Sequence, residues 1–357
     1  MKCKKAIGMI LSAAVIISGC NSADVIEDVT TEDIVIISES AKVTEPAPDV
    51  TAESEKEPEK LYEFNPHLYS VKLGDIIPDE YYRAFYSFAD AVREGKDTFE
   101  CPSEEAYKWV TDSVVLNILL PAACMKITGE SNDGTVPFEN GTGRIYYTMP
   151  AEEFVIREAE YESAIEDVLN TWLDYDDTDF EKCVKLYDYM ESTFTYGEVD
   201  PSSTGDGIDY KCFCIRQGIC DNLASIYAYL LMQAGVDALN IGIFEPGMCH
   251  AWTYVVINGE GYHIDPTWSL KNGSDDLPLY YFMMSDERRE DTGCLLNDIT
   301  VPLLPRYWVN YYDGLDFKAS DNSYEFPTCS ALVSLDEDNK ILFYRNESGE
   351  MCEMRYG

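Results

Sequence analysis

The chain has 357 residues, and its 66 Asp and Glu against 26 Lys and Arg give a formal net charge of −40. A field of that sign repels nucleic acid and anionic lipid head groups, which excludes a nucleic-acid-binding protein. It would attract cationic peptides or polymers, although a general contribution to solubility is sufficient to explain it.

Residues 1–19 have the pattern of a cleaved signal peptide. Three lysines precede an apolar stretch from Ala6 to Ile17 that is too short to span a bilayer. The stretch ends in Ile17-Ser18-Gly19 before Cys20, which resembles a bacterial lipobox. The resemblance implies cleavage before Cys20, diacylglycerol on its thiol and a bacterial protein anchored to the outer face of the cell membrane. The alternative is an ordinary secretory signal followed by an unrelated cysteine.

Residues 20–62 are expected to form an acidic, disordered tether that begins at the lipidated cysteine. Residues 21–60 contain 12 acidic and 3 basic residues and show no helical periodicity. Self-repulsion should keep such a segment extended and solvated. A flexible chain of this length reaches roughly 35 Å, so it would hold a folded body away from the membrane.

Residues 63–175 are predicted to be a mainly helical N-terminal region. Apolar residues recur at helical spacing, which predicts helices over residues 78–94, 103–120 and 151–173. A short strand is expected between them, over residues 144–148. The region would cover one side of the body that follows it.

Cys220 is predicted to lie in the first turn of a buried helix. From Leu223 onward the apolar residues follow a helical stripe, Gly218 precedes the helix, and Gly235 ends it. The unpaired N–H groups of the first turn lower the pKa of a thiol. The neighbouring Asp221 should raise it, so a basic partner is needed.

His250 and Asp265 are predicted to meet across a β-hairpin. Residues 248–257 and 262–268 read as its strands, and Asn258-Gly259 between them is a strong hairpin signal. With a two-residue turn, Trp252 faces Asp265, and Asp265 lies diagonal to His250 on the same face. A four-residue loop would instead place Asp265 opposite Tyr254, too far away to orient His250.

Together these residues form a candidate set for thiol catalysis. Cys220 would be the nucleophile, His250 the base and acid, and Asp265 the group that fixes the imidazole tautomer. The chain has only three histidines. His263, on the same face as Asp265, is an alternative partner for it, although packing beside the site is the simpler interpretation.

Three further side chains are candidates for the same site. Gln217 is placed to donate to an oxyanion together with the Cys220 N–H. Trp252 and Trp268 would either wall a substrate cleft or pack in the core.

A zinc site is the competing chemical interpretation. Its donors would be Cys212, Cys214, Cys220, Cys249 and His250. The Cys-x₂-Cys spacing of zinc sites is missing from this set, so no metal and no cofactor are expected. Of the 12 cysteines, ten follow Cys20, and a free Cys220 leaves nine, which cannot all pair. At least one more free thiol fits a poorly oxidising environment.

Residues 319–357 are predicted to form a small C-terminal β-meander. Alternating segments over 329–335, 341–345 and 351–356 are separated by turn sequences at 336–339 and 346–349. The meander would be an accessory module.

The motifs around the candidate triad resemble those of the transglutaminase-like superfamily. They are Gly218-Ile219-Cys220, His250-Ala251-Trp252 and Asp265-Pro266-Thr267-Trp268, and residues 179–196 also resemble the helix that opens that domain. The resemblance covers residues 179–286. It implies an α+β, papain-like core over residues 176–318, with a cysteine helix set against an antiparallel sheet. Asp221 stands where the eukaryotic cross-linking enzymes carry an aromatic residue, and no calcium loop is evident.

The sequence therefore predicts a lipid-anchored, extracytoplasmic thiol enzyme that acts on amide bonds of peptides or proteins, cell-wall peptides included. Hydrolysis is favoured over cross-linking because it needs no second substrate. The competing class is a catalytically inactive surface protein of the same fold that binds peptide or glycan.

Overall fold

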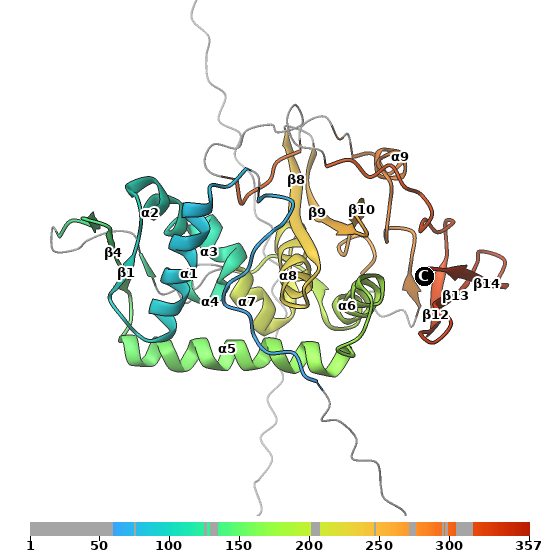
Figure 1. Ribbon diagram of the computed structural model, residues 1–357. Helices are drawn as coiled ribbons and strands as arrows, with labels where there is room; N and C mark the ends of the chain where they lie inside the picture. Colours follow the sequence, from blue (N-terminus) through green and yellow to red (C-terminus); the bar gives the residue numbers. More distant parts are fainter. Residues whose placement is uncertain are drawn as a thin grey trace, which may run out of the picture. The chain divides into compact units, whose positions relative to one another are not determined.

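The described part of the chain is an α+β structure in which helices flank antiparallel sheets (Figure 1). The computed structural model describes residues 60–74, 76–124, 127–128, 135–200, 208–245, 248–270, 276–294, 296, 299–304 and 317–357. The predicted signal peptide, Cys20 and nearly all of the predicted tether lie outside these residues.

The N-terminal region is mainly helical, as predicted. Its helices are α1 (Asp79–Arg93), α2 (Glu104–Val110), α3 (Ser113–Leu119), α4 (Pro121–Cys124) and α5 (Ala151–Trp172). The predictions of helices over 78–94 and 151–173 are confirmed. The single helix predicted over 103–120 is wrong, because Asp112 has extended backbone and its side chain caps α3 by accepting from the Val114 N–H.

Short strands complete this region. They are β1 (Thr98–Glu100), β2 (Ile127–Thr128), β3 (Phe138–Glu139), β4 (Thr142–Arg144) and β5 (Tyr146–Tyr147). β4 lies between β1 and β3, whereas β5 pairs with β2. The strand predicted over 144–148 is therefore divided between two sheets. Helix α5 passes along this region and continues beneath the central helices to α6 (Figure 1).

The central body sets a cysteine helix against a three-stranded antiparallel sheet. Its helices are α6 (Asp179–Thr193), α7 (Ile208–Ile215) and α8 (Cys220–Gln233), and its sheet has the order β10 (Glu260–Ile264), β9 (Met248–Ile257), β8 (Asp237–Glu245). Helix α8 packs on β8 and β9 (Figure 1). Thr253 Oγ1 on β9 donates to the Ala224 carbonyl on α8 over 3.0 Å, which joins helix and sheet. A short parallel pair, β6 (Thr195–Tyr196) and β7 (Gln217–Gly218), precedes α8.

The cysteine helix has the predicted ends. Asn222 Oδ1 accepts from the Ile219 N–H at 3.1 Å and so caps the first turn. Gly235, with φ at +84°, follows the last turn in a left-handed conformation that suits glycine. Gly218 is also required, because a Cβ there would lie 2.9 Å from the Asn222 Cβ.

The β9–β10 hairpin has the two-residue turn predicted from Asn258-Gly259. Glu260 pairs with Ile257, and both turn residues have positive φ, at 54° and 85°. The four-residue alternative is excluded. The second strand is shorter than predicted and ends at Ile264, since Pro266 lacks an N–H and the Asp265 side chain accepts from the N–H groups beyond it. Residues 265–268, which were predicted to belong to this strand, therefore lie outside it.

The C-terminal β-meander is present and gains a fourth strand. β12 (Ala331–Asp336), β13 (Ile341–Arg345) and β14 (Met351–Arg355) follow one another, and β11 (Leu277–Pro278) pairs with β12. Helix α9 (Asp286–Asp291) lies in the segment between β11 and β12.

A buried carboxylate joins the meander to the start of α6. Glu181 caps α6 together with Thr178 and also accepts from Lys340 Nζ at 2.9 Å and the Tyr356 hydroxyl at 2.7 Å. Burial alone would raise its pKa, but the hydrogen bonds from Lys340, Thr178 and Tyr356 lower the pKa of Glu181 to about 2. The Phe180 ring stacks on Tyr356 beside it.

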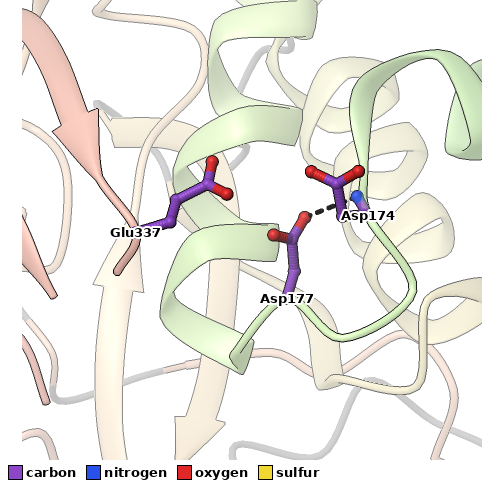
Figure 2. A group of neighbouring side chains, drawn as sticks. All are labelled: Asp174, Asp177 and Glu337. Atoms are coloured by element: carbon purple, nitrogen blue, oxygen red, sulfur yellow. Dashed lines mark hydrogen bonds between the residues drawn. The ribbon is translucent and has the colours of Figure 1, made fainter. Parts of the chain in front are cut away.

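Three further carboxylates converge at the same junction. Asp174 and Asp177 come from the α5–α6 connection and Glu337 from the meander (Figure 2). Lys185 Nζ lies 2.7 Å from Asp177, 2.8 Å from Glu337 and 3.3 Å from Asp174, so the cation at this cluster is a side chain of the chain itself. Its ammonium joins helix α6 to the meander a second time.

The described residues all belong to one unit. The chain divides into Met1–Glu57 and Pro58–Gly357, and the predicted boundaries at 175/176 and 318/319 fall inside the second of these. None of the helices in the described part is long and apolar enough to cross a bilayer. All ten cysteines that the structure describes are free thiols.

Candidate active site

Cys220 is the first residue of α8 and is half-buried. Its thiol interacts with His250 from β9 and with the main-chain N–H groups of Ala251 and Asp221. Burial is the largest influence and raises the thiol pKa, but these hydrogen bonds together bring the pKa of Cys220 below its ordinary value. The Asp221 carboxylate, predicted to oppose this, is itself bound by Asn240 Nδ2 at 3.0 Å.

His250 and Asp265 meet as the hairpin register predicts. His250 Nε2 lies 2.6 Å from Asp265 Oδ2, with the Asp265 side chain fully buried. Because Nε2 is engaged by the carboxylate, Nδ1 is the ring nitrogen left for the thiol. Burial lowers the pKa of His250, but the contacts with Asp265 and Cys220 outweigh it and raise that pKa to about 9. The site thus favours an imidazolium at neutral pH and shifts the Cys220 thiol toward its thiolate form.

Arg289 completes the site and was missed by the sequence analysis. Its guanidinium is fully buried, with Nη1 2.9 Å from Asp265 Oδ2. Asp265 Oδ1 accepts from the N–H groups of Thr267 and Trp268, so the carboxylate receives four hydrogen bonds. Burial raises the pKa of Asp265, but Arg289 and His250 overcome it and keep that pKa below the usual range. Asp265 is therefore an anion that orients His250.

The two tryptophans have different positions. Trp252 is fully buried, which agrees with the core-packing alternative and not with a cleft wall, and its Nε1 donates to His263 Nδ1 at 3.0 Å. Trp268 is 39% exposed and stacks on the His250 ring, with the centroids 4.5 Å apart. Arg289 lies over both indole rings. Trp268 is thus the one of the pair that offers an aromatic surface beside the histidine.

His263 is not the partner of Asp265. Its Nδ1 accepts from Trp252, and its Nε2 lies 3.0 Å from Asp286 Oδ1. Since Nδ1 accepts, the neutral ring carries its proton on Nε2 and donates to Asp286. Complete burial lowers the pKa of His263, which keeps the ring neutral. The residue packs beside the site, as the simpler interpretation held.

Gln217 lies on β7, three residues before Cys220. Its Nε2 donates to the Glu198 carbonyl at 3.1 Å, and the amide lies against Gly197, where a Cβ would come within 2.5 Å of Nε2. Its role as an oxyanion donor stays a prediction.

Cys220 and His250 contact each other, but the proposed zinc donors form no group of three among the residues that the structure describes. Within the described part of the chain, Asp174, Asp177 and Glu337 are the metal-ligating side chains that form a group of three. The ammonium of Lys185 already pairs with this group. Cys212 is buried, whereas Cys214 and Cys249 are exposed.

The comparisons with known proteins agree with the resemblance seen in the motifs. Residues 168–266 match the transglutaminase-like superfamily, so this part of the chain, which contains Cys220, His250 and Asp265, is a transglutaminase-like domain. No curated protein matches the sequence.

Two solved structures are similar over part of the chain. One, provisionally named a cysteine protease, comes from Cytophaga hutchinsonii. Its sequence is 14% identical to this chain, the TM-score is 0.24, and the match covers 30% of this chain and 37% of that one. The other, provisionally named a protease, comes from Parabacteroides distasonis: 11% identity, TM-score 0.24, covering 38% of this chain and 31% of that one. The chain thus spans only about a third of the length of each.

Proposed function

We propose that the protein is a thiol hydrolase that cleaves amide bonds of peptides or proteins, with Cys220 as nucleophile. The observation that carries the proposal is the chain of contacts from Arg289 through Asp265 and His250 to the Cys220 thiol. It leaves a basic ring nitrogen facing a thiol whose pKa is lowered, which is the arrangement that thiol catalysis requires.

The reaction would proceed in two halves. The Cys220 thiolate attacks the amide carbonyl carbon, and the oxyanion is stabilised by the Cys220 N–H with Gln217 as the proposed second donor. When the C–N bond breaks, the amine leaves with the proton from His250 Nδ1, and a thioester remains on Cys220. Water then loses a proton to His250, attacks the thioester, and releases the acid and the thiolate.

Asp265 and Arg289 act through His250 in this scheme. During the reaction the His250 ring alternates between its imidazolium and neutral forms, and the buried Asp265 carboxylate keeps Nε2 protonated in both forms. Arg289 keeps the carboxylate ionised. The exposed Trp268 ring beside His250 and Tyr196, which is 56% exposed and near Cys220, favour a substrate with an apolar or aromatic group beside the scissile bond.

Alkylation by iodoacetamide at graded pH tests the proposal. The wild-type protein should react at Cys220 well below pH 8, and His250→Ala should slow that reaction by roughly 10- to 100-fold at pH 6.5, since a charge-assisted hydrogen bond is worth about 1.5–3 kcal/mol. The matched control is His67→Ala, whose ring pairs with Asp90 on the surface. If Cys220 reacts no faster than the exposed Cys329, the proposed nucleophile is wrong, and a binding protein of the same fold becomes the better assignment.

We also propose that Cys20 carries a lipid that anchors the enzyme to the outer face of the cell membrane. The support is the sequence before Cys20 and the acidic segment after it. Cys20→Ser should release the protein from the membrane fraction, with Cys124→Ser as the control. Unchanged membrane association of Cys20→Ser would overturn the anchor and leave the thiol chemistry untouched.

A further inference from the structure

A cavity of about 310 Å³ lies where the N-terminal helices meet the cysteine helix. Its walls come from α3, the end of α4, the start of α7, the first turns of α8, strand β8 and Pro302. The volume is at the small end of the range for ligand pockets, which runs from roughly 300 to 1,000 Å³. It suits a small molecule or a single side chain rather than a polymer.

The cavity is acidic. Asp209 and Asp221 both line it, and no Lys, Arg or His is found among its described lining residues. The amides of Asn117 and Asn222 donate to Asp209 at 2.7 and 2.9 Å, and the Ser225 hydroxyl also hydrogen-bonds to it. Burial, with the charge of Asp221 contributing, raises the pKa of Asp209 to about 7.

The polar wall contains a buried acceptor that has no partner among the described residues. Asn240 must turn its Nδ2 toward Asp221, because the carbonyl and carboxylate of Asp221 offer only acceptors, at 3.4 and 3.0 Å. Asn240 Oδ1 is thereby fixed as an acceptor, and it is buried with no hydrogen-bond partner in the described part of the chain. Val114 and Ile118 supply apolar surface to the same cavity.

We infer that this cavity binds an aliphatic primary ammonium group, of the kind carried by diamines and lysine side chains, with Asp221 as its counter-ion. An ammonium group has three donors and no acceptor, which complements a wall of carboxylates and amide oxygen. The methylenes next to it would lie along Val114 and Ile118. Binding itself does not rest on the proposed catalytic function.

The cavity is connected to the catalytic cysteine by sequence. Asp221 directly follows Cys220, and its main-chain N–H contacts the thiol. A bound cation would neutralise the anion adjacent to the thiol and so favour the thiolate. This second consequence rests on the proposed function of Cys220 and is measured separately from binding.

Titration of the full chain carrying Cys220→Ala with cadaverine, followed by calorimetry, tests binding without any acyl transfer. We expect saturable binding to one site, a loss of at least tenfold in affinity in Asp221→Asn, and no change in the exposed control Asp338→Asn. Val114→Trp, which fills the cavity, should abolish binding, whereas Ile156→Trp, at an exposed position of α5, should not. If Asp221→Asn does not fold, the loss of cadaverine binding in Val114→Trp tests the inference instead.

Pentan-1-ol and Nα-acetyl-lysine methylamide distinguish the ligand chemistry. The neutral alcohol should not bind. If the lysine derivative binds more tightly than cadaverine, the cavity is assigned to a substrate side chain. If cadaverine binds more tightly, the cavity is assigned to a free amine. Equal binding of pentan-1-ol, or cadaverine binding that is unaffected by Asp221→Asn and Val114→Trp, would overturn the inference.

Alkylation of the wild-type protein measures the coupling to Cys220. Saturating cadaverine should accelerate iodoacetamide labelling of Cys220 at pH 6.5 by roughly two- to fivefold, as expected for a partly exposed ion pair. Asp221→Asn should remove the acceleration. Binding without acceleration would leave the ammonium site standing and refute its link to the thiol.

Discussion

Arg289→Met tests whether the buried guanidinium maintains the anion that orients the histidine. The substitution removes the positive charge 2.9 Å from Asp265 Oδ2 but keeps a long apolar side chain between the Trp252 and Trp268 rings. Both members of the ion pair are fully buried, so water cannot replace the lost partner.

The magnitude follows from what Asp265 retains. Removal of one partner from a buried ion pair costs about 3–5 kcal/mol. Here the carboxylate keeps three of its four donors, from His250, Thr267 and Trp268. Arg289 Nε and Nη2 are buried without partners in the described part of the chain, and their burial penalty disappears with the substitution. We therefore expect the lower end of the range, about 3 kcal/mol.

Urea denaturation at pH 7 measures the effect. Arg157→Met is the control, because Arg157 is exposed and pairs with Glu153 on the surface of α5, where a loss within about 0.5 kcal/mol is expected. The double variant Arg289→Met with Asp265→Asn should lose less stability than the sum of the single losses, by at least about 1 kcal/mol. A loss below 1 kcal/mol for Arg289→Met, or additive losses, would refute the reasoning.

Two further substitutions test the framework around the site. Glu181→Gln should lower the free energy of unfolding by about 2 kcal/mol at pH 7, because its charged hydrogen bonds to Lys340 and Tyr356 weaken. The folded-state pKa of Glu181 is about 2, below the ordinary 4.5, so this stabilisation is full above pH 4.5 and is lost as the pH falls toward 2. Urea titrations across that interval should show that the difference in unfolding free energy between wild type and Glu181→Gln decreases. A difference that stays constant with pH would contradict the prediction. Gly261→Ala should lower the melting temperature and slow Cys220 alkylation, because the new Cβ would collide with the Tyr254 hydroxyl and disturb the β9–β10 pairing; an unchanged melting temperature would show that Tyr254 moves aside freely.

The elements nearest the candidate catalytic residues were predictable because their signals are local. The stripe from Leu223 and the glycines at its ends define α8, and Asn258-Gly259 sets the hairpin register. That register in turn brings His250 to Asp265. A pattern of a few residues carries all of this information.

Other features depend on contacts between distant segments. Arg289 lies 24 residues beyond Asp265 in a charged run, Asp286 to Asp291, that is typical of a solvated helix, and nothing local shows that it turns inward. The pairing of β11 with β12 likewise joins residues more than fifty positions apart. The break between α2 and α3 had a local signal in Asp112, which the apolar periodicity over 103–120 obscured.

The Asn258-Gly259 turn also determines where this chain tolerates insertions. Side chains alternate between the faces of a strand, so one added residue in the turn would move Asp265 to the opposite face of the sheet from His250. Surface connections elsewhere accept added residues at small entropic cost. Relatives that keep this chemistry should therefore vary in length in their other loops and keep this turn at two residues.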